Sequence, residues 1–263
     1  MAAYRVLRDG SDVSGESGAE RAVGFAEYLA TSQLESQRLV EAALAAGLDA
    51  AVPTCPGWTV GGLLKHVGGL ARGVTDYLRT GNPHPPTEAA KQSWFVSPPA
   101  GTDLVDWYAG TRAELAEAFL AADPQTAYFS FLPAESPLLF WARRNAHETA
   151  IHRADVQLAA GAEITPYEAA FARDGIAELL AFTALSLRAD PGFTIAAAGS
   201  LLHVGPADCT VAPDSGGPVD LRLVGPASAV YLTLWNRTPP TDVQLAGDPA
   251  LLDYWRNHAR WEL

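Results

Sequence analysis

The feature that most constrains the fold of this 263-residue chain is a change of pattern near residue 190. Before that point, long segments carry apolar residues at intervals of three and four, which is the period of an amphipathic helix. From Phe193 onward, short β-like runs are separated by turn residues such as glycine, proline and aspartate. We therefore expect an α plus α+β fold, in which an all-α part is followed by a small α+β part.

Five helices are expected in the N-terminal part. The first is rich in alanine, leucine and glutamate and ends at Gly47, and Thr59 is a suitable N-cap for the second. The five are expected over residues 20–47, 59–79, 102–122, 137–160 and 166–188. Residues 81–102 contain five prolines and few periodic apolar residues, so a long surface loop is expected there. A loop of that length is often a lid or the wall of a binding site.

The C-terminal part is expected to combine short strands with helices. One strand is followed by a clear turn signal, PDSGG, at residues 213–217. Strands are expected at residues 201–204, 209–212, 219–224 and 242–245, and helices at 226–236 and 248–259. The expected divisions of the chain are a flexible tail over residues 1–19, a helical domain over 20–190 and an α+β domain over 191–263.

The composition excludes some classes of partner. The net charge is −12, so no basic face is expected that could release counterions from nucleic acid or bind an anionic membrane. No apolar run is long enough to span a membrane, and residues 1–20 lack the apolar core of a signal peptide. Cys55 and Cys209 lie far apart without a CxxC partner, which is typical of a reduced protein. We expect a cytoplasmic protein with no nucleic-acid and no membrane partner.

Glu148 and His152 form the most informative local pattern. On a helix, residues four apart differ by about 40° in rotation, so these two side chains project from one face and can bind the same ion. His147 differs from His152 by about 140° and points away from it. Asp155 can contact the imidazole from the same face. A third ligand has to come from elsewhere, and His66 lies on the inward stripe of the second expected helix.

The spacing alone leaves other interpretations open. A glutamate and a histidine four residues apart usually form a surface hydrogen bond, and Arg144 is placed to form a salt bridge with Glu148. A single inward-facing histidine such as His66 is more often a hydrogen-bonded core residue than a ligand. Cys55 has no base near it in the sequence, so a structural role is favoured over a nucleophilic one.

Three parts of the chain together resemble a known family. Residues 52–60 (VPTCPGWTV) and 64–69 (LKHVGG) are similar to the N-terminal signature of the mycothiol-dependent maleylpyruvate isomerase family. Residues 141–155 (WARRNAHETAIHRAD) resemble its second signature. Residues 227–237 (ASAVYLTLWNR) and 243–248 (VQLAGD) resemble its C-terminal domain.

The resemblance implies a DinB-like four-helix bundle followed by a small sterol-carrier-like α+β domain. It implies a divalent metal, usually zinc, held by His66, Glu148 and His152. It also implies mycothiol as a thiol cosubstrate: the metal would bind the thiol, lower its pKa and hold a thiolate at neutral pH. Arg237 matches a C-terminal arginine that helps to bind an anionic substrate or thiol, and it is the expected catalytic residue.

The expected function is therefore a metal-dependent isomerase or thiol S-transferase that acts on a small electrophile with a low-molecular-weight thiol. Two alternatives keep the fold but change the activity. One is a metal-dependent hydrolase or biosynthetic enzyme that does not use a thiol, and thiol-independent turnover would favour it. The other is a non-enzymatic protein that binds a small molecule, which a missing metal would favour.

Overall fold

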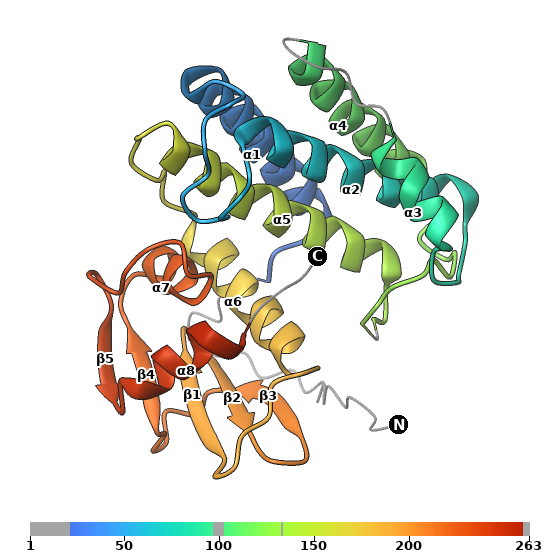
Figure 1. The fold of residues 1–263 in the computed structure, drawn as a ribbon. Helices are drawn as coiled ribbons and strands as arrows, with labels where there is room; N and C mark the ends of the chain where they lie inside the picture. Colours follow the sequence, from blue (N-terminus) through green and yellow to red (C-terminus); the bar gives the residue numbers. More distant parts are fainter. Residues whose placement is uncertain (1–21, 97–102, 133, 260–263) are drawn as a thin grey trace, which may run out of the picture. The chain divides into compact units, whose positions relative to one another are not determined.

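The computed structural model describes residues 22–96, 103–132 and 134–259, and within these ranges the chain forms eight helices and a five-stranded sheet (Figure 1). The expected tail over residues 1–19 lies outside the described residues. The helices are α1 (Phe25–Ala46), α2 (Val60–Thr80), α3 (Glu88–Phe95), α4 (Asp103–Ala121), α5 (Pro137–Ala159), α6 (Ala169–Thr183), α7 (Ala227–Leu234) and α8 (Ala250–His258). The strands are β1 (Phe193–Ala197), β2 (Ser200–Val204), β3 (Cys209–Pro213), β4 (Leu221–Val224) and β5 (Gln244–Gly247). The expected α plus α+β class is confirmed.

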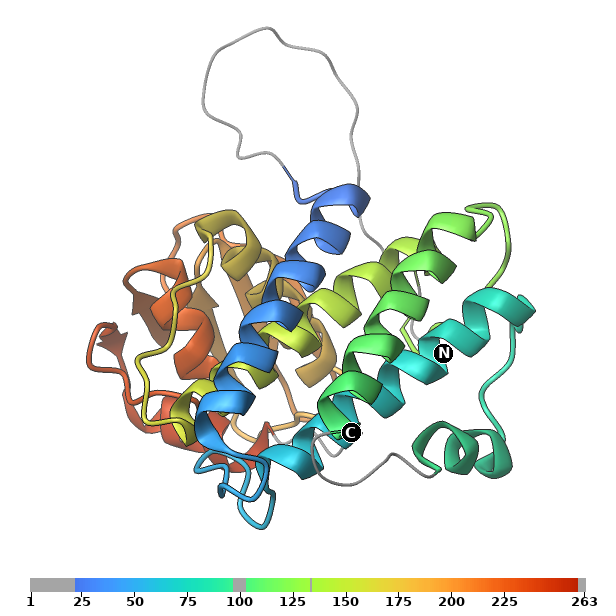
Figure 2. The same cartoon turned by 90° about the horizontal axis from the view of Figure 1, so that it is seen from above.

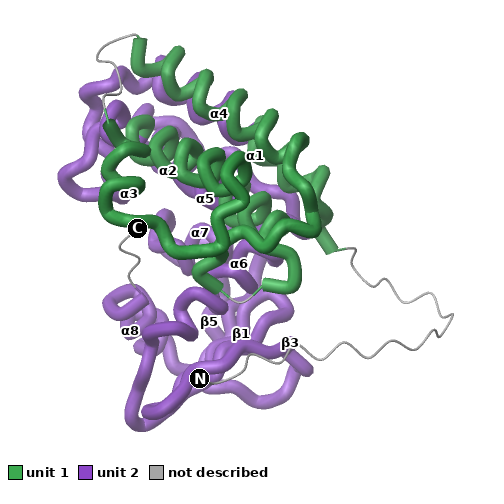
Figure 3. Tube along the Cα trace, turned by 90° about the vertical axis from the view of Figure 1, so that its right-hand side faces the viewer, with its two compact units in different colours: residues 1–33, 64–146 green, residues 34–63, 147–263 purple. Residues whose placement is uncertain are grey.

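The chain divides into two compact units (Figure 3). The first unit takes in the chain up to Gln33 together with residues 64–146. The second takes in residues 34–63 and the chain from His147 onward. Three helices, α1, α2 and α5, therefore contribute residues to both units, and the five strands all belong to the second.

Glycines on α2 allow close packing in the first unit. A Cβ atom on Gly68 would lie 2.4 Å from the ring of Trp107 on α4, and one on Gly69 would lie 2.3 Å from the ring of Phe95 on α3. Because a real Cβ does not approach other atoms so closely, only glycine lets these elements meet without a shift. Figure 2 shows the resulting arrangement of α2 and α4, which run side by side.

Helix α3 corrects the loop that was expected over residues 81–102. Thr87 caps this helix, since its hydroxyl accepts a hydrogen bond from the Ala90 amide at 3.1 Å. The residues that follow the cap, EAAKQ at 88–92, are good helix formers. The three prolines at the start of the expected loop all precede the cap, where they do not interrupt the helix. The position of the prolines, rather than their number, decides the structure.

The sheet of the second unit is mixed, with the strand order β3-β2-β1-β4-β5. Neighbouring strands are antiparallel except for the parallel pair β1 and β4. Strand β1 was not expected, because its sequence, FTIAA, contains two alanines, which are weak strand formers. Its central position compensates, since four of its five residues are buried. Ala198 and Gly199 join β1 to β2 with positive φ angles of 48° and 90°, as in a type I′ hairpin.

Helices α6, α7 and α8 complete the second unit. Helix α6 packs against α7 and against β2 and β3. Helix α8 is fixed by its aromatic residues: Trp255 is fully buried and its Nε1 donates to the Leu234 carbonyl at the end of α7 at 2.8 Å. The ring of Tyr254 meets that of Phe193 edge to face at 5.3 Å. None of the described helices is long and apolar enough to cross a membrane.

Candidate functional site

Helix α5 presents an imidazole held between two carboxylates. His152 Nε2 lies 2.9 Å from Glu148 Oε1, and His152 Nδ1 lies 2.9 Å from Asp155 Oδ2. All three residues are buried, and Asp155 has no exposed surface. The i, i+3 and i+4 spacing places them on one helix face, as the sequence predicts. The expected contact between Asp155 and the imidazole is therefore confirmed.

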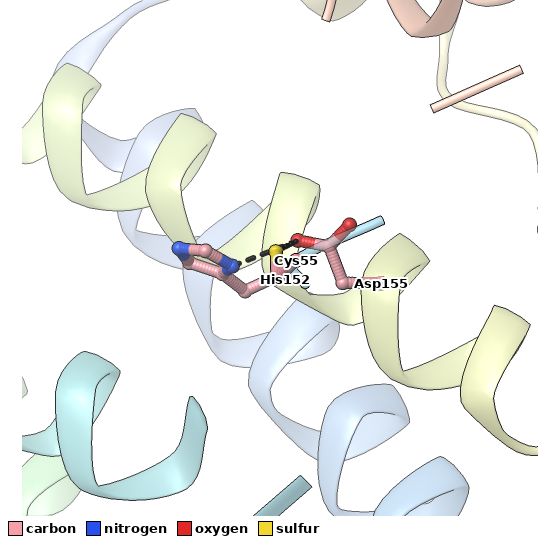
Figure 4. Close-up of side chains that lie close together, drawn as sticks. All are labelled: Cys55, His152 and Asp155. Carbon is pink, nitrogen blue, oxygen red and sulfur yellow. Dashed lines mark hydrogen bonds and ion pairs between the residues drawn. The ribbon is translucent and has the colours of Figure 1, made fainter. Parts of the chain in front are cut away.

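Asp155 also joins this helix to two other segments of the second unit. The Thr54 hydroxyl donates to Asp155 Oδ1, and Cys55 Sγ lies 3.6 Å from Oδ2. Arg237 pairs with the same carboxylate, with Nη2 3.0 Å from Oδ2 and Nε 2.8 Å from Oδ1. Figure 4 shows Cys55, His152 and Asp155 close together. One buried carboxylate thus contacts an imidazole, a hydroxyl, a thiol and a guanidinium.

A tight turn places Thr54 and Cys55 against the Asp155 carboxylate. The Val52 amide donates to the Trp58 carbonyl at 3.0 Å, and the Trp58 amide donates to the Cys55 carbonyl at 3.0 Å. Gly57 has a φ of +86°, a left-handed conformation that glycine adopts without strain. The segment that reads VPTCPGW in the sequence is therefore a closed loop with its tip at Asp155.

The end of α7 directs Arg237 to Asp155. Asn236 has a φ of +58°, and its amide donates to the Thr233 carbonyl at 3.1 Å. The Arg237 amide donates to the Leu232 carbonyl at 2.9 Å. These two bonds around a left-handed residue form a Schellman motif, which ends the helix and reverses the chain. Asparagine tolerates that conformation better than most residues other than glycine.

The charges of the cluster shift the pKa values of its members. Burial alone would lower the pKa of His152, but the Glu148 and Asp155 carboxylates outweigh it and raise that pKa to about 9. Burial alone would raise the pKa of Asp155, but His152 and Arg237 outweigh it and lower that pKa to about 2. In the metal-free protein at neutral pH, His152 is therefore an imidazolium between two carboxylates.

Cys55 is not a thiolate in this environment. Burial raises the pKa of Cys55 to about 11, and the neighbouring Asp155 carboxylate adds to the effect more strongly than Arg237 opposes it. The side chain therefore stays a protonated thiol near neutral pH, and a nucleophilic role is disfavoured. This agrees with the structural role that the sequence favours for Cys55.

The two sides of the imidazole differ in their suitability for a metal ion. Ligand atoms of Cys55, His152 and Asp155 lie within 4.8 Å of one another. Arg237 already pairs with Asp155 and lies 3.9 Å from Cys55 Sγ, so a second cation is disfavoured on this side. On the other side, His152 Nε2 faces the Glu148 carboxylate. A histidine whose Nδ1 is held by a carboxylate is typical of metal-binding histidines. Glu148 and His152 thus fit a divalent metal with nitrogen and oxygen ligands.

His66 and His147, the other two histidines of interest, have different surroundings. His66 lies on α2 in the first unit, where its ring stacks on Phe95 with centroids 6.5 Å apart. It remains a predicted third ligand. His147 is fully buried in the second unit, with Nε2 2.8 Å from Asp174 Oδ2 and Nδ1 3.1 Å from the Tyr231 hydroxyl. It contacts α6 and α7, and its rotation on the helix predicts only that it points away from His152.

The fold and this cluster define a class of protein: a set of long helices joined to a small mixed sheet, with an imidazole and two carboxylates on a buried helix face. The chain belongs to the mycothiol-dependent maleylpyruvate isomerase family. Residues 29–157 match the family model described as the mycothiol maleylpyruvate isomerase N-terminal domain, and residues 170–254 match its C-terminal domain.

Two solved structures share the fold. The crystal structure of the mycothiol-dependent maleylpyruvate isomerase has a TM-score of 0.62 and 16% sequence identity, over 85% of this chain and 93% of that one. A histidine-to-alanine mutant of that isomerase has a TM-score of 0.61, with the same identity and coverage. Among curated proteins, none matches the chain.

Proposed function

We propose that this protein is a divalent-metal-dependent enzyme of the maleylpyruvate isomerase type, which uses mycothiol to isomerise or S-conjugate a small electrophilic substrate. The observation that carries the proposal is the orientation of His152. Its Nδ1 is held by Asp155, and its Nε2 faces Glu148 at 2.9 Å. Family membership supports the use of a low-molecular-weight thiol.

The proposed metal ligands are His66, Glu148 and His152, and zinc is the proposed ion. Two imidazoles and one carboxylate are ligands that zinc uses in catalytic sites that keep an open position. A divalent cation there would lower the pKa of a coordinated thiol and so supply a thiolate at neutral pH. His152 has to lose its proton for Nε2 to become a ligand, because only the neutral imidazole binds a metal.

Asp155 is the proposed positioning residue of this site. It accepts the Nδ1–H of His152 and thereby fixes the tautomer whose Nε2 is available as a ligand. Arg237 balances the charge of Asp155 and keeps that carboxylate ionised. The proposed catalytic role of Arg237 is retained, since its side chain is 14% exposed and Nη1, which does not hold Asp155, has a second N–H besides the one donated to the Trp235 carbonyl that can contact an anionic substrate.

We also propose that the helical part over residues 20–190 holds the metal, and that the α+β part over residues 191–263 supplies Arg237. Supporting this division, all five strands begin after residue 190. The chemistry would then depend on both parts, because Glu148, His152 and Asp155 come from α5 while Arg237 follows α7.

The test is a turnover assay with and without the thiol. The full-length, zinc-loaded protein is given maleylpyruvate in the presence and absence of mycothiol, and the isomer is quantified. We expect turnover only with mycothiol. The His152→Ala variant should lose it, while His203→Ala, which removes an exposed histidine of β2, should not. Equal turnover without the thiol, or full activity of His152→Ala, would contradict the proposal.

A further inference from the structure

A recess in the surface of the second unit is lined by two arginines and no acidic residue. Its volume is about 470 Å³, within the range typical of small-molecule sites. The lining residues are Asn236, Arg237, Thr238, Pro239 and Arg256. The first four form the loop that follows α7, and Arg256 lies in the last turn of α8. The buried Trp255, bonded to the end of α7, holds α8 beside that loop.

The positive charge of Arg237 is already paired with a carboxylate of the protein. Nε and Nη2 pair with Asp155, and Nη1 donates to the Trp235 carbonyl at 2.7 Å. The neighbouring carboxylate neutralises the guanidinium, so Arg237 contributes little net positive charge to the recess. Any anion bound there would need a second cation.

Arg256 supplies that cation. Its side chain is partly exposed, and within the described part of the chain no carboxylate forms an ion pair with it. Asp253, three residues earlier on α8, is exposed and does not pair with it. Among the described residues, no carboxylate neutralises the guanidinium of Arg256, and its planar set of donors matches the two oxygens of a carboxylate. Asn236 and Thr238 add neutral hydrogen-bonding groups to the same lining.

We propose that this recess binds the carboxylate of a small anionic ligand and that Arg256 is the residue that selects for the negative charge. That the ligand is the substrate of the enzyme rests on the proposed function, but binding of the carboxylate in the recess does not. In this arrangement Arg237 forms the inner wall and links the bound anion to Asp155, while Arg256 provides the attraction.

The test is calorimetric titration of the full-length protein with succinate, and separately with inorganic phosphate. We expect succinate to bind, and Arg256→Gln to weaken binding about tenfold, because a hydrogen bond to a charged group is lost. Arg256→Lys should weaken binding less, since the charge remains while the planar donors are lost. The matched control is Arg79→Gln, which removes an exposed arginine of the first unit and should leave binding unchanged. Thermal melting verifies that each variant is folded.

Two results would overturn the proposal: equal succinate affinity in the wild type and Arg256→Gln, or a preference for phosphate over succinate that also depends on Arg256. A preference for phosphate that depends on Arg256 would indicate that the recess binds a tetrahedral oxyanion instead of a carboxylate. The zinc content and the thiol dependence of turnover are measured on the same samples. Succinate binding that depends on Arg256, in a protein with no thiol-dependent turnover, would support the recess and contradict the proposed function. Thiol-dependent turnover without succinate binding would support the proposed function and contradict the binding of a carboxylate in the recess.

Discussion

Asp155 and Arg237, which are 82 residues apart in the sequence, form an ion pair between a fully buried carboxylate and a partly buried guanidinium, and this pair links α5 to the segment after α7. The same carboxylate holds the Nδ1 of His152 at 2.9 Å. Because Asp155 has no exposed surface, its charge is stabilised by these contacts rather than by water. The pair therefore affects the stability of the second unit as well as the orientation of the imidazole.

Replacing Asp155 should be costly for this reason. Asp155→Asn leaves the partly buried Arg237 without its counter-ion, and we expect the free energy of unfolding to fall by about 3 kcal/mol in urea titrations. Asp253→Asn, at an exposed position of α8, is the control and should change it by less than about 0.5 kcal/mol. In a double-mutant cycle with Arg237→Gln, the two substitutions should be clearly non-additive. Additive effects would show that the two residues act independently.

The pKa of His152 predicts how stability depends on pH when no metal is bound. This pKa is raised from 6.5 to about 9, so its contribution is fully present below about pH 6.5 and is lost as the pH rises toward 9. Asp155 acts in the opposite direction at low pH: its contribution is present above about pH 4 and is lost as the pH falls toward 2.

In EDTA, we therefore expect the wild-type protein to lose between about 1 and 3 kcal/mol of stability from pH 6.5 to 9. His152→Gln should show a flatter profile in the same urea titrations. If the metal-free wild type became more stable over this range, the charged state assigned to His152 would be wrong.

The reactivity of the two cysteines tests the electrostatics around Asp155. Burial raises the pKa of Cys55 to about 11, and that of Cys209 to about 11 as well. At pH 8 only about one thiol in a thousand is then ionised, so both should react slowly with iodoacetamide in the native protein. Asp155→Asn removes a carboxylate beside Cys55 and should speed its alkylation, while Cys209 on β3 keeps its rate. Equal rates at Cys55 before and after that substitution would count against the contact.

Packing of α3 on α2 gives a prediction for the first unit. In Gly69→Ala the new Cβ would meet the Phe95 ring, on which His66 stacks, and we expect a loss of about 1–3 kcal/mol of stability. Gly110→Ala on α4 is the matched control, since nothing lies within 4 Å of its Cβ position. It should stabilise the helix by up to about 1 kcal/mol. Hydrogen exchange over residues 88–95 should increase only in Gly69→Ala.

Local patterns in the sequence predicted the elements that depend on local rules. Helix α5 was expected over 137–160 and spans Pro137–Ala159, because its apolar period and its flanking residues agree. Strand β1 was not expected because its sequence contains two alanines, which have a low strand propensity. Burial in the centre of the sheet stabilises it instead. Helix α3 replaces part of the expected loop because the prolines at residues 83, 85 and 86 all precede its N-cap, Thr87, and so do not interrupt it.

The site shows the same difference between local and distant relationships. The shared helix face of Glu148, His152 and Asp155 follows from helix geometry and was predicted. The convergence of Thr54 and Arg237 on Asp155 was not, since contacts between residues 82 and 101 positions apart depend on the fold. The family resemblance includes the motif around Cys55 and the segment before Arg237. Neither sequence pattern, however, indicates which distant residue it contacts.

The proposed binding of one metal ion by His66, Glu148 and His152 is tested most directly by metal analysis with mass spectrometry. After equilibration with zinc and removal of the excess, the wild type should retain about one zinc ion per chain. His66→Ala, Glu148→Gln and His152→Ala should each retain almost none, while the control His203→Ala should retain as much as the wild type. Full retention of zinc by any of the three ligand variants, or no retention by the wild type, would contradict the account.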